Sequence, residues 1–158
     1  MKEVLLRTAR TLKQPGDASI KEFGAQWETL AARGTQIFRM RPDVDRLIGR
    51  GNEPMAEDNN RNFPRFMASL FLAYQPEVFV DTVLWVFRTY RAHGFHTDFW
   101  TVNLNLWVDL LKKELSPETF IDIQPFYNWL MVNVPLFVTL TDLDLSDQGH
   151  ISALGSET

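Results

Sequence analysis

Apolar residues recur three and four positions apart through most of the chain, and this spacing predicts an all-α protein. Side chains at these intervals share one face of a helix, so each apolar stripe marks a face that packs into a core. Helices are expected over residues 19–33, 43–48, 54–73, 76–93, 98–115 and 117–134. No segment alternates apolar and polar residues as a half-buried strand does. We therefore expect about six helices and no sheet.

Capping and breaking residues set the expected ends of these helices. Ser19 and Glu22 have the spacing of a capping box at the start of the first long helix, and Gly34 is expected to end it. Gly94 is expected to stop a later helix in the left-handed conformation, and Thr97 to cap the helix that follows. The connections between helices are therefore predicted to be short.

A single domain is predicted over residues 19–140, with a less structured segment at each end. Residues 1–18 form an N-terminal segment, and residues 141–158 are polar, small and partly acidic, which is typical of a disordered tail. We expect that removing the residues after Thr141 leaves stability and ligand binding nearly unchanged. The helical periodicity is compatible with either a four-helix bundle or a globin-like packing.

Composition narrows the range of functions. The chain has 158 residues with 12 Phe, 5 Trp and 3 Tyr, which suits a core of large flat side chains or a pocket for a flat ligand. Its net charge is −4 and it has no run of Lys or Arg, so binding to nucleic acid is not expected. The most apolar stretch, 126–140, is shorter than the ~20 residues of a membrane span.

Several catalytic and metal sites are excluded by the residues that the chain lacks. It has no cysteine, which excludes disulfides, thiolate metal sites and a thioether-linked chromophore, and is compatible with a reducing cytoplasm. It has no Gly-rich phosphate loop, no G-x-S-x-G motif and no H-E-x-x-H motif. We therefore expect a cytoplasmic protein that is not an enzyme and has no metal centre.

Residues 85–111 resemble the central part of the bacterial sensor globins. In that family one helix ends at a glycine, and a short turn leads into a long helix that begins near an aromatic residue. Gly94, Phe95 and then Phe99 or Trp100 follow this order. The chain is most similar to the bilin biosynthesis-associated globins, which are related in fold to phycobiliproteins, in the stretches DNNRNFPRFMASLF (58–71), TVLWVFRTYRAHGFH (82–96) and PFYNWL (125–130).

This resemblance, which covers residues 19–134, implies a globin-like packing of about six helices. It also implies non-covalent binding of an open-chain tetrapyrrole, a bilin of the biliverdin or phycocyanobilin type. Four residues before Gly94, where a haem-binding globin has its proximal histidine, the chain has Tyr90. Tyrosine is a rarer haem ligand than histidine, so the resemblance points to the non-haem branch of the superfamily. Haem stays as the alternative cofactor.

Arginines on two predicted helices are candidates for binding the propionates of a tetrapyrrole. Arg88 and Arg91 lie one turn apart on one helix, and Arg61 and Arg65 lie one turn apart on another. Each pair could hold a carboxylate through paired hydrogen bonds. The alternative is that each side chain is simply solvated.

The other candidate site residues are aromatic or polar. Tyr90 shares a stripe with the core, so its hydroxyl could meet a ring carbonyl or a haem iron, or bond to backbone within the core. Trp100 could form an aromatic wall or belong to the core. His93 and His96 flank a helix end and could bond to the rim of a ligand or occupy the turn. Asn59 either marks a helix start or faces the pocket.

Three functions remain open from the sequence. The first is a carrier or sensor of a bilin, with a bilin-biosynthesis enzyme or a signalling protein as its partner. The second is a ligand-free signalling or scaffold domain that forms a homodimer through an exposed helix face. The third is a haem-binding globin with an atypical proximal ligand. A red to near-infrared absorption band is expected for the first, a Soret band for the third, and neither for the second.

Overall fold

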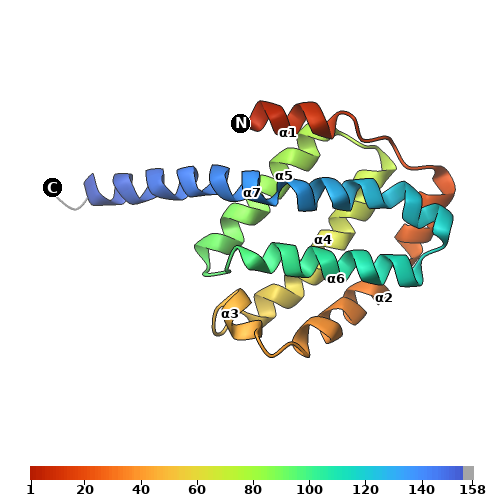
Figure 1. Ribbon diagram of the computed structural model, residues 1–158, viewed down its shortest axis with the longest axis horizontal. Coiled ribbons are helices and arrows are strands. Elements are labelled where there is room, and N and C mark those ends of the chain that lie inside the picture. Colours follow the sequence, from red (N-terminus) through yellow and green to blue (C-terminus); the bar gives the residue numbers. More distant parts are fainter. Residues whose placement is uncertain (155–158) are drawn as a thin grey trace.

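The computed structural model describes the backbone of residues 1–154 and the side chains of residues 1–145. In this part of the chain, short loops join seven helices. In chain order they are α1 (Lys2–Ala9), α2 (Asp17–Arg39), α3 (Val44–Ile48), α4 (Glu53–Leu72), α5 (Pro76–Ala92), α6 (Asp98–Glu114) and α7 (Pro117–Leu154) (Figure 1). Residues 1–154 contain no strand. The prediction of an all-α domain with about six helices is therefore confirmed.

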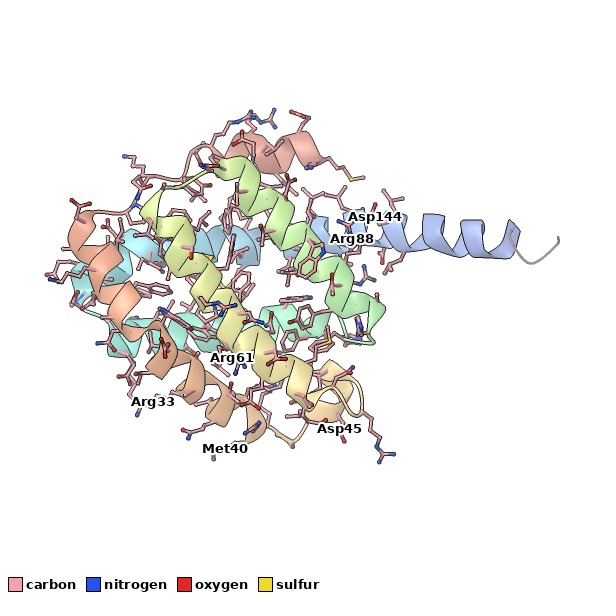
Figure 2. All side chains as sticks on the ribbon, turned by 180° about the vertical axis from the view of Figure 1, so that it is seen from behind. Arg33, Met40, Asp45, Arg61, Arg88 and Asp144 are labelled. Atoms are coloured by element: carbon pink, nitrogen blue, oxygen red, sulfur yellow. The ribbon has the colours of Figure 1, made fainter. Side chains whose placement is uncertain are left out.

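The helices pack in pairs around one core. α6 packs along α7, and Figure 2, which shows the molecule from behind, has α4 and α5 in front of them. α2 packs on α4 and also contacts α6 and α7, while α1 packs on α5. The backbone of α4 lies closest to α2, and the backbone of α5 lies closest to α1 and α7, so the backbones of α4 and α5 approach each other at few points. Side chains alone therefore fill the space between α4 and α5.

The core is largely a continuous series of aromatic rings. Neighbouring rings have centroids between 4.3 Å and 6.0 Å apart and mostly meet edge to face or tilted, as aromatic pairs prefer. The series runs from α2 through α4, α7, α5 and α6 and returns to α2, by way of Phe23, Phe71, Phe126, Phe79, Trp129, Phe137, Phe87, Trp100, Phe99 and Phe38. The high aromatic content of the sequence is thus used mainly for packing.

Gly34 lies inside α2 and does not end it, so the predicted end of the first long helix is wrong. The helix continues to Arg39, and Gly34 is buried against the indole of Trp107 on α6. A Cβ atom at position 34 would lie 3.3 Å from Cζ2 of Trp107. A glycine here serves close packing between two helices, and tertiary contacts outweigh its poor helix propensity.

We expect two glycine substitutions in α2 to shift stability in opposite directions. Gly34→Leu should lower the free energy of unfolding by about 1–3 kcal/mol, because the added atoms enter a filled space beside Trp107. Gly24→Ala should raise it by about 0.5–1 kcal/mol, because nothing lies within 4 Å of its new Cβ and alanine favours the helix. Urea unfolding of both variants measures the difference, and equal effects would contradict the packing described for Gly34.

Ser19 and Glu22 do not form the predicted capping box. The helix begins two residues earlier, at Asp17, and both side chains reach toward other helices. Ser19 Oγ donates to a carboxylate oxygen of Asp122 on α7 at 2.8 Å, and the Glu22 carboxylate accepts from the backbone N–H of Ser116 at 3.2 Å. The pair therefore fastens α2 to the start of α7.

The turn between α5 and α6 has the predicted glycine stop but a different cap. Gly94 has φ of +97°, and the N–H of Phe95 donates to the carbonyl of Tyr90, which is the pattern of a Schellman motif. Thr97 makes no side-chain cap bond, and the N–H of Asp98 donates to Nδ1 of His96 at 3.0 Å. His96 is therefore the residue that caps α6.

Both chain ends are more ordered than the sequence predicts. Residues 2–9 form α1, whose Leu5 and Ala9 are fully buried, so the N-terminal segment belongs to the domain. Of the predicted tail, residues 141–154 continue α7 away from the body of the molecule (Figure 1), and residues 155–158 lie outside the described part of the chain. Thr141 is fully buried, and Arg91 of α5 donates to its hydroxyl at 2.8 Å.

We expect truncation after Thr141 to lower the melting temperature, contrary to the sequence-based expectation. It removes Asp142 and Asp144, the partners of Arg91 and Arg88. The two ion pairs, each with an exposed carboxylate, should contribute about 1 kcal/mol together, or roughly 2–4 °C. Truncation after Leu145 keeps both carboxylates and is the matched control, so equal melting temperatures for the two truncated chains would show that these ion pairs contribute nothing.

The whole apolar stretch at 126–140 lies in α7 as a partly buried helix, and α7 continues past residue 134, where the sequence predicts its end. One side of this segment enters the core through Phe126, Tyr127, Leu130, Val134 and Phe137. Within residues 1–154, no helix combines the length and the apolar character that crossing a lipid bilayer requires.

Candidate functional site

A cavity lies where α4, α5, α6 and α7 come together, and we call it the interhelical cavity. α4 and α5 form two of its walls, and α6 and α7 form the rest. It is lined by Asn59, Phe63, Val83, Val86, Phe87, Trp100, Asn103, Leu104, Trp107, Tyr127 and Leu130. Its free space is about 20 Å³, which is room for about one water molecule.

Three polar side chains on the cavity wall have buried atoms without a hydrogen-bond partner. These are Nε1 of Trp100, Oδ1 of Asn103 and the hydroxyl of Tyr127. Among the side chains of residues 1–145, the only other such atom is Nε of Arg88, which lies outside the cavity lining. An orphaned buried polar group typically costs about 1–3 kcal/mol. The concentration of three such groups at one cavity makes it the candidate functional site.

The three groups offer both donors and an acceptor. Trp100 Nε1 can only donate, whereas Oδ1 of Asn103 can only accept. Burial raises the pKa of Tyr127, so its phenol stays protonated at neutral pH and can donate as well. Asn59 brings a further buried amide from α4 to the same wall. The site can therefore satisfy a molecule that carries both carbonyl and N–H groups.

Flat apolar walls surround these polar groups. The ring of Phe87 stacks on the indole of Trp100 with centroids 4.3 Å apart and an interplanar angle of 21°. Trp107 closes the α6 side, held by a bond from its Nε1 to Oδ1 of Asn60 at 3.2 Å. Phe63 of α4 lines the cavity while still half-buried, so one wall reaches toward the surface.

Of the residues that the sequence singled out, only Asn59 and Trp100 line the cavity. Tyr90 is buried directly behind Trp100, with its ring edge-on at 5.8 Å between centroids. Burial, and to a lesser extent the Asp58 carboxylate of α4, raises the pKa of Tyr90. Tyr90 therefore supports the wall and is not part of it.

The four arginines lie away from the cavity. Figure 2 shows Arg88 of α5 beside Asp144 of α7, with Nε and Oδ2 separated by 3.7 Å. Arg91 binds Asp142 and the carbonyl of Val138, also on α7. Arg61 pairs with Asp58 at 2.7 Å and lines a surface groove between α2 and α4. These arginines are held by acidic or backbone groups of the protein itself.

The remaining arginine and the two histidines also have local partners at the surface. Arg65 is exposed and donates to Oδ1 of Asn62 at 3.2 Å. Nδ1 of His93 lies 2.8 Å from the carbonyl of Thr89, and His96 caps α6. Within residues 1–145, no group of three or more His, Cys, Asp or Glu side chains is placed to hold a metal ion.

Sequence reasoning missed Asn103 and Tyr127. Asn103 is a polar residue within the apolar stripe of Phe99, Leu106 and Leu110, and Tyr127 is the second residue of the apolar stretch at 126–140. A polar group at a core position signals either a buried partner or a site. In this case the sequence contains the signal, but only the structure shows that both residues face one cavity and lack a partner.

Comparison with protein-family models, with curated proteins and with solved structures finds no match.

Proposed function

We propose that this protein binds an open-chain tetrapyrrole, a bilin of the biliverdin or phycocyanobilin type, without a covalent bond. One observation supports this proposal: three buried polar groups without a hydrogen-bond partner and flat aromatic side chains line the same interhelical cavity. A bilin offers lactam carbonyls, pyrrole N–H groups and a long apolar edge. The chain has no cysteine, so no thioether could hold the chromophore.

In this proposal the residues of the cavity wall have separate roles. Trp100 and Tyr127 donate to a lactam carbonyl, and Oδ1 of Asn103 accepts from a pyrrole N–H. Phe87 and Trp107 form the flat walls. The propionates stay at the mouth in water, because the four candidate arginines are engaged elsewhere.

The cavity has to open for a bilin to enter. Small-molecule sites typically have about 300–1,000 Å³, far more than the 20 Å³ of the closed cavity. Opening is feasible at the boundary between α4 and α5, because each of them packs mainly on other helices. Half-buried Phe63 is the cavity residue that can turn outward with the least loss of packing.

The wider proposal is a carrier or sensor with a globin-like packing, located in the cytoplasm and working beside a bilin-biosynthesis enzyme or a signalling protein. One observation favours a second function, a ligand-free scaffold, because the cavity is nearly filled by the protein's own side chains. Haem is less well supported, since no histidine lines the cavity.

Absorption spectroscopy tests the proposed function. Biliverdin titrated into the purified protein is expected to give a saturable red to near-infrared band that differs from that of free biliverdin. Haem added in the same way is expected to give no ligated Soret band. Absence of a saturable biliverdin band would support the ligand-free scaffold, and a strong Soret band would support haem.

A further inference from the structure

The first half of α4, which ends just before Pro64, lies between two small cavities. Asn59 and Phe63 line the interhelical cavity. Asn60, on the neighbouring side of the same helix, lines a second cavity of about 20 Å³ between α2, α3 and α4. Protein interiors are close-packed, so free space along two of its sides gives a helix room to move. We call residues 53–63 the gate segment of α4.

Pro64 interrupts the hydrogen bonds of α4 directly after the gate segment. It lies inside the helix, and proline has no backbone N–H, so the carbonyl of Asn60 receives no helical bond from residue 64. The ring of an interior proline also presses on that carbonyl and bends the helix. Pro64 itself does not line the interhelical cavity. The turn without its backbone bond therefore includes Phe63, the half-buried residue of the cavity wall.

The start of the gate segment is anchored to other elements but is not capped. Asn52, the N-cap residue, makes no side-chain bond to the helix, and its Nδ2 donates to the carbonyls of Ile48 and His93 at 2.7 Å each. Gly49 and Gly51 come just before, with φ of +80° and +87°, a region that glycine adopts at little cost. The segment therefore has a fixed pivot at one end and an interrupted helix at the other.

We propose that the gate segment tilts away from α5 at Pro64 to admit the bilin, and that this tilting limits how strongly the bilin binds. The inference rests on the proposed function, because a bilin needs far more room than the 20 Å³ of the closed cavity. The backbones of α4 and α5 approach each other at few points, so the tilt separates mainly side chains. When the open form is only partly populated, the apparent affinity falls by that fraction.

Pro64→Ala restores the missing backbone bond and should hold the gate segment closed. Biliverdin affinity is expected to fall by about 2- to 10-fold, the equivalent of one net hydrogen bond, mainly through slower association. Stopped-flow absorption of the biliverdin band gives both rate constants. Pro135→Ala is the matched control, because Pro135 also lies inside a helix, α7, but is exposed and does not line the cavity. It should leave the affinity unchanged.

Amide hydrogen exchange of the ligand-free protein tests the gate without the bilin. Pro64→Ala should slow exchange at residues 57–63 by about 2- to 10-fold and leave residues 79–87 of α5 unchanged, whereas Pro135→Ala should change neither. Equal exchange at residues 57–63 in the wild type and Pro64→Ala, or equal biliverdin affinity in these two proteins, would overturn the gate. If Pro64→Ala slows exchange but the wild type gives no saturable biliverdin band, the opening of the segment stands and the bilin is refuted as its ligand.

Discussion

Replacing Tyr127 with Phe is expected to raise the melting temperature of the ligand-free protein by about 2–12 °C. The phenol is buried, and its hydroxyl has no hydrogen-bond partner among the described residues. Removing an orphaned buried polar group recovers its desolvation cost, about 1–3 kcal/mol. For a chain of this length each kcal/mol corresponds to roughly 2–4 °C. Differential scanning calorimetry measures the change directly.

Tyr74→Phe is the matched control, because it removes the same atom from a satisfied group. The hydroxyl of Tyr74 donates to the carbonyl of Ala9 at 2.6 Å. Its loss should lower the melting temperature by about 2–4 °C, since a net hydrogen bond contributes about 1 kcal/mol. Shifts of opposite sign are the signature of a binding group kept at a cost in stability. A lower melting temperature for Tyr127→Phe would show that the hydroxyl has a structural partner.

The double variant Asn103→Leu with Tyr127→Phe is expected to lose bilin affinity by roughly 5- to 150-fold while remaining folded. It removes one acceptor and one donor from the cavity wall, and each lost hydrogen bond costs about 0.5–1.5 kcal/mol of binding. The walls stay apolar, so the ligand-free protein should be at least as stable as the wild type. Titration of the biliverdin absorption band gives the dissociation constants.

Asn105→Leu controls for the same substitution on the same helix. The Asn105 side chain is exposed and bonds only to the carbonyl of Thr101, one turn earlier. Its bilin affinity should equal that of the wild type. Wild-type affinity in the double variant would place the bilin outside the interhelical cavity.

The helices could largely be predicted from the sequence because their signals are local. The periodicity of apolar residues and the left-handed stop at Gly94 depend on neighbours within one or two turns. The errors came from residues whose roles depend on distant partners. Gly34 reads locally as a helix end, but its contact with Trp107 keeps it inside α2. Ser19 and Glu22 have the spacing of a cap, but stronger partners lie on and beside α7.

The candidate site could be predicted only in part for the same reason. The sequence left Trp100 open as a wall or a core residue and Asn59 as a helix start or a pocket residue, and the structure places both in the cavity lining. Arg88 and Arg91 have the expected one-turn spacing, but the sequence cannot show that α7 continues and brings Asp142 and Asp144 to them. Asn103 and Tyr127 carry no local motif. An unpaired polar atom is a property of the packed structure, so their role became visible only in three dimensions.

Amide hydrogen exchange with and without biliverdin tests most directly whether the interhelical cavity is the binding site. Bound bilin should slow exchange along the facing parts of α4 and α5, around Asn59 to Phe63 and Val83 to Phe87. It should also slow exchange in α6 near Trp100 and Asn103 and in α7 near Tyr127 and Leu130. Exchange in α1, which does not line the cavity, should stay unchanged. Slowing confined to the surface groove between α2 and α4, or no slowing at any amide at saturating biliverdin, would contradict the account.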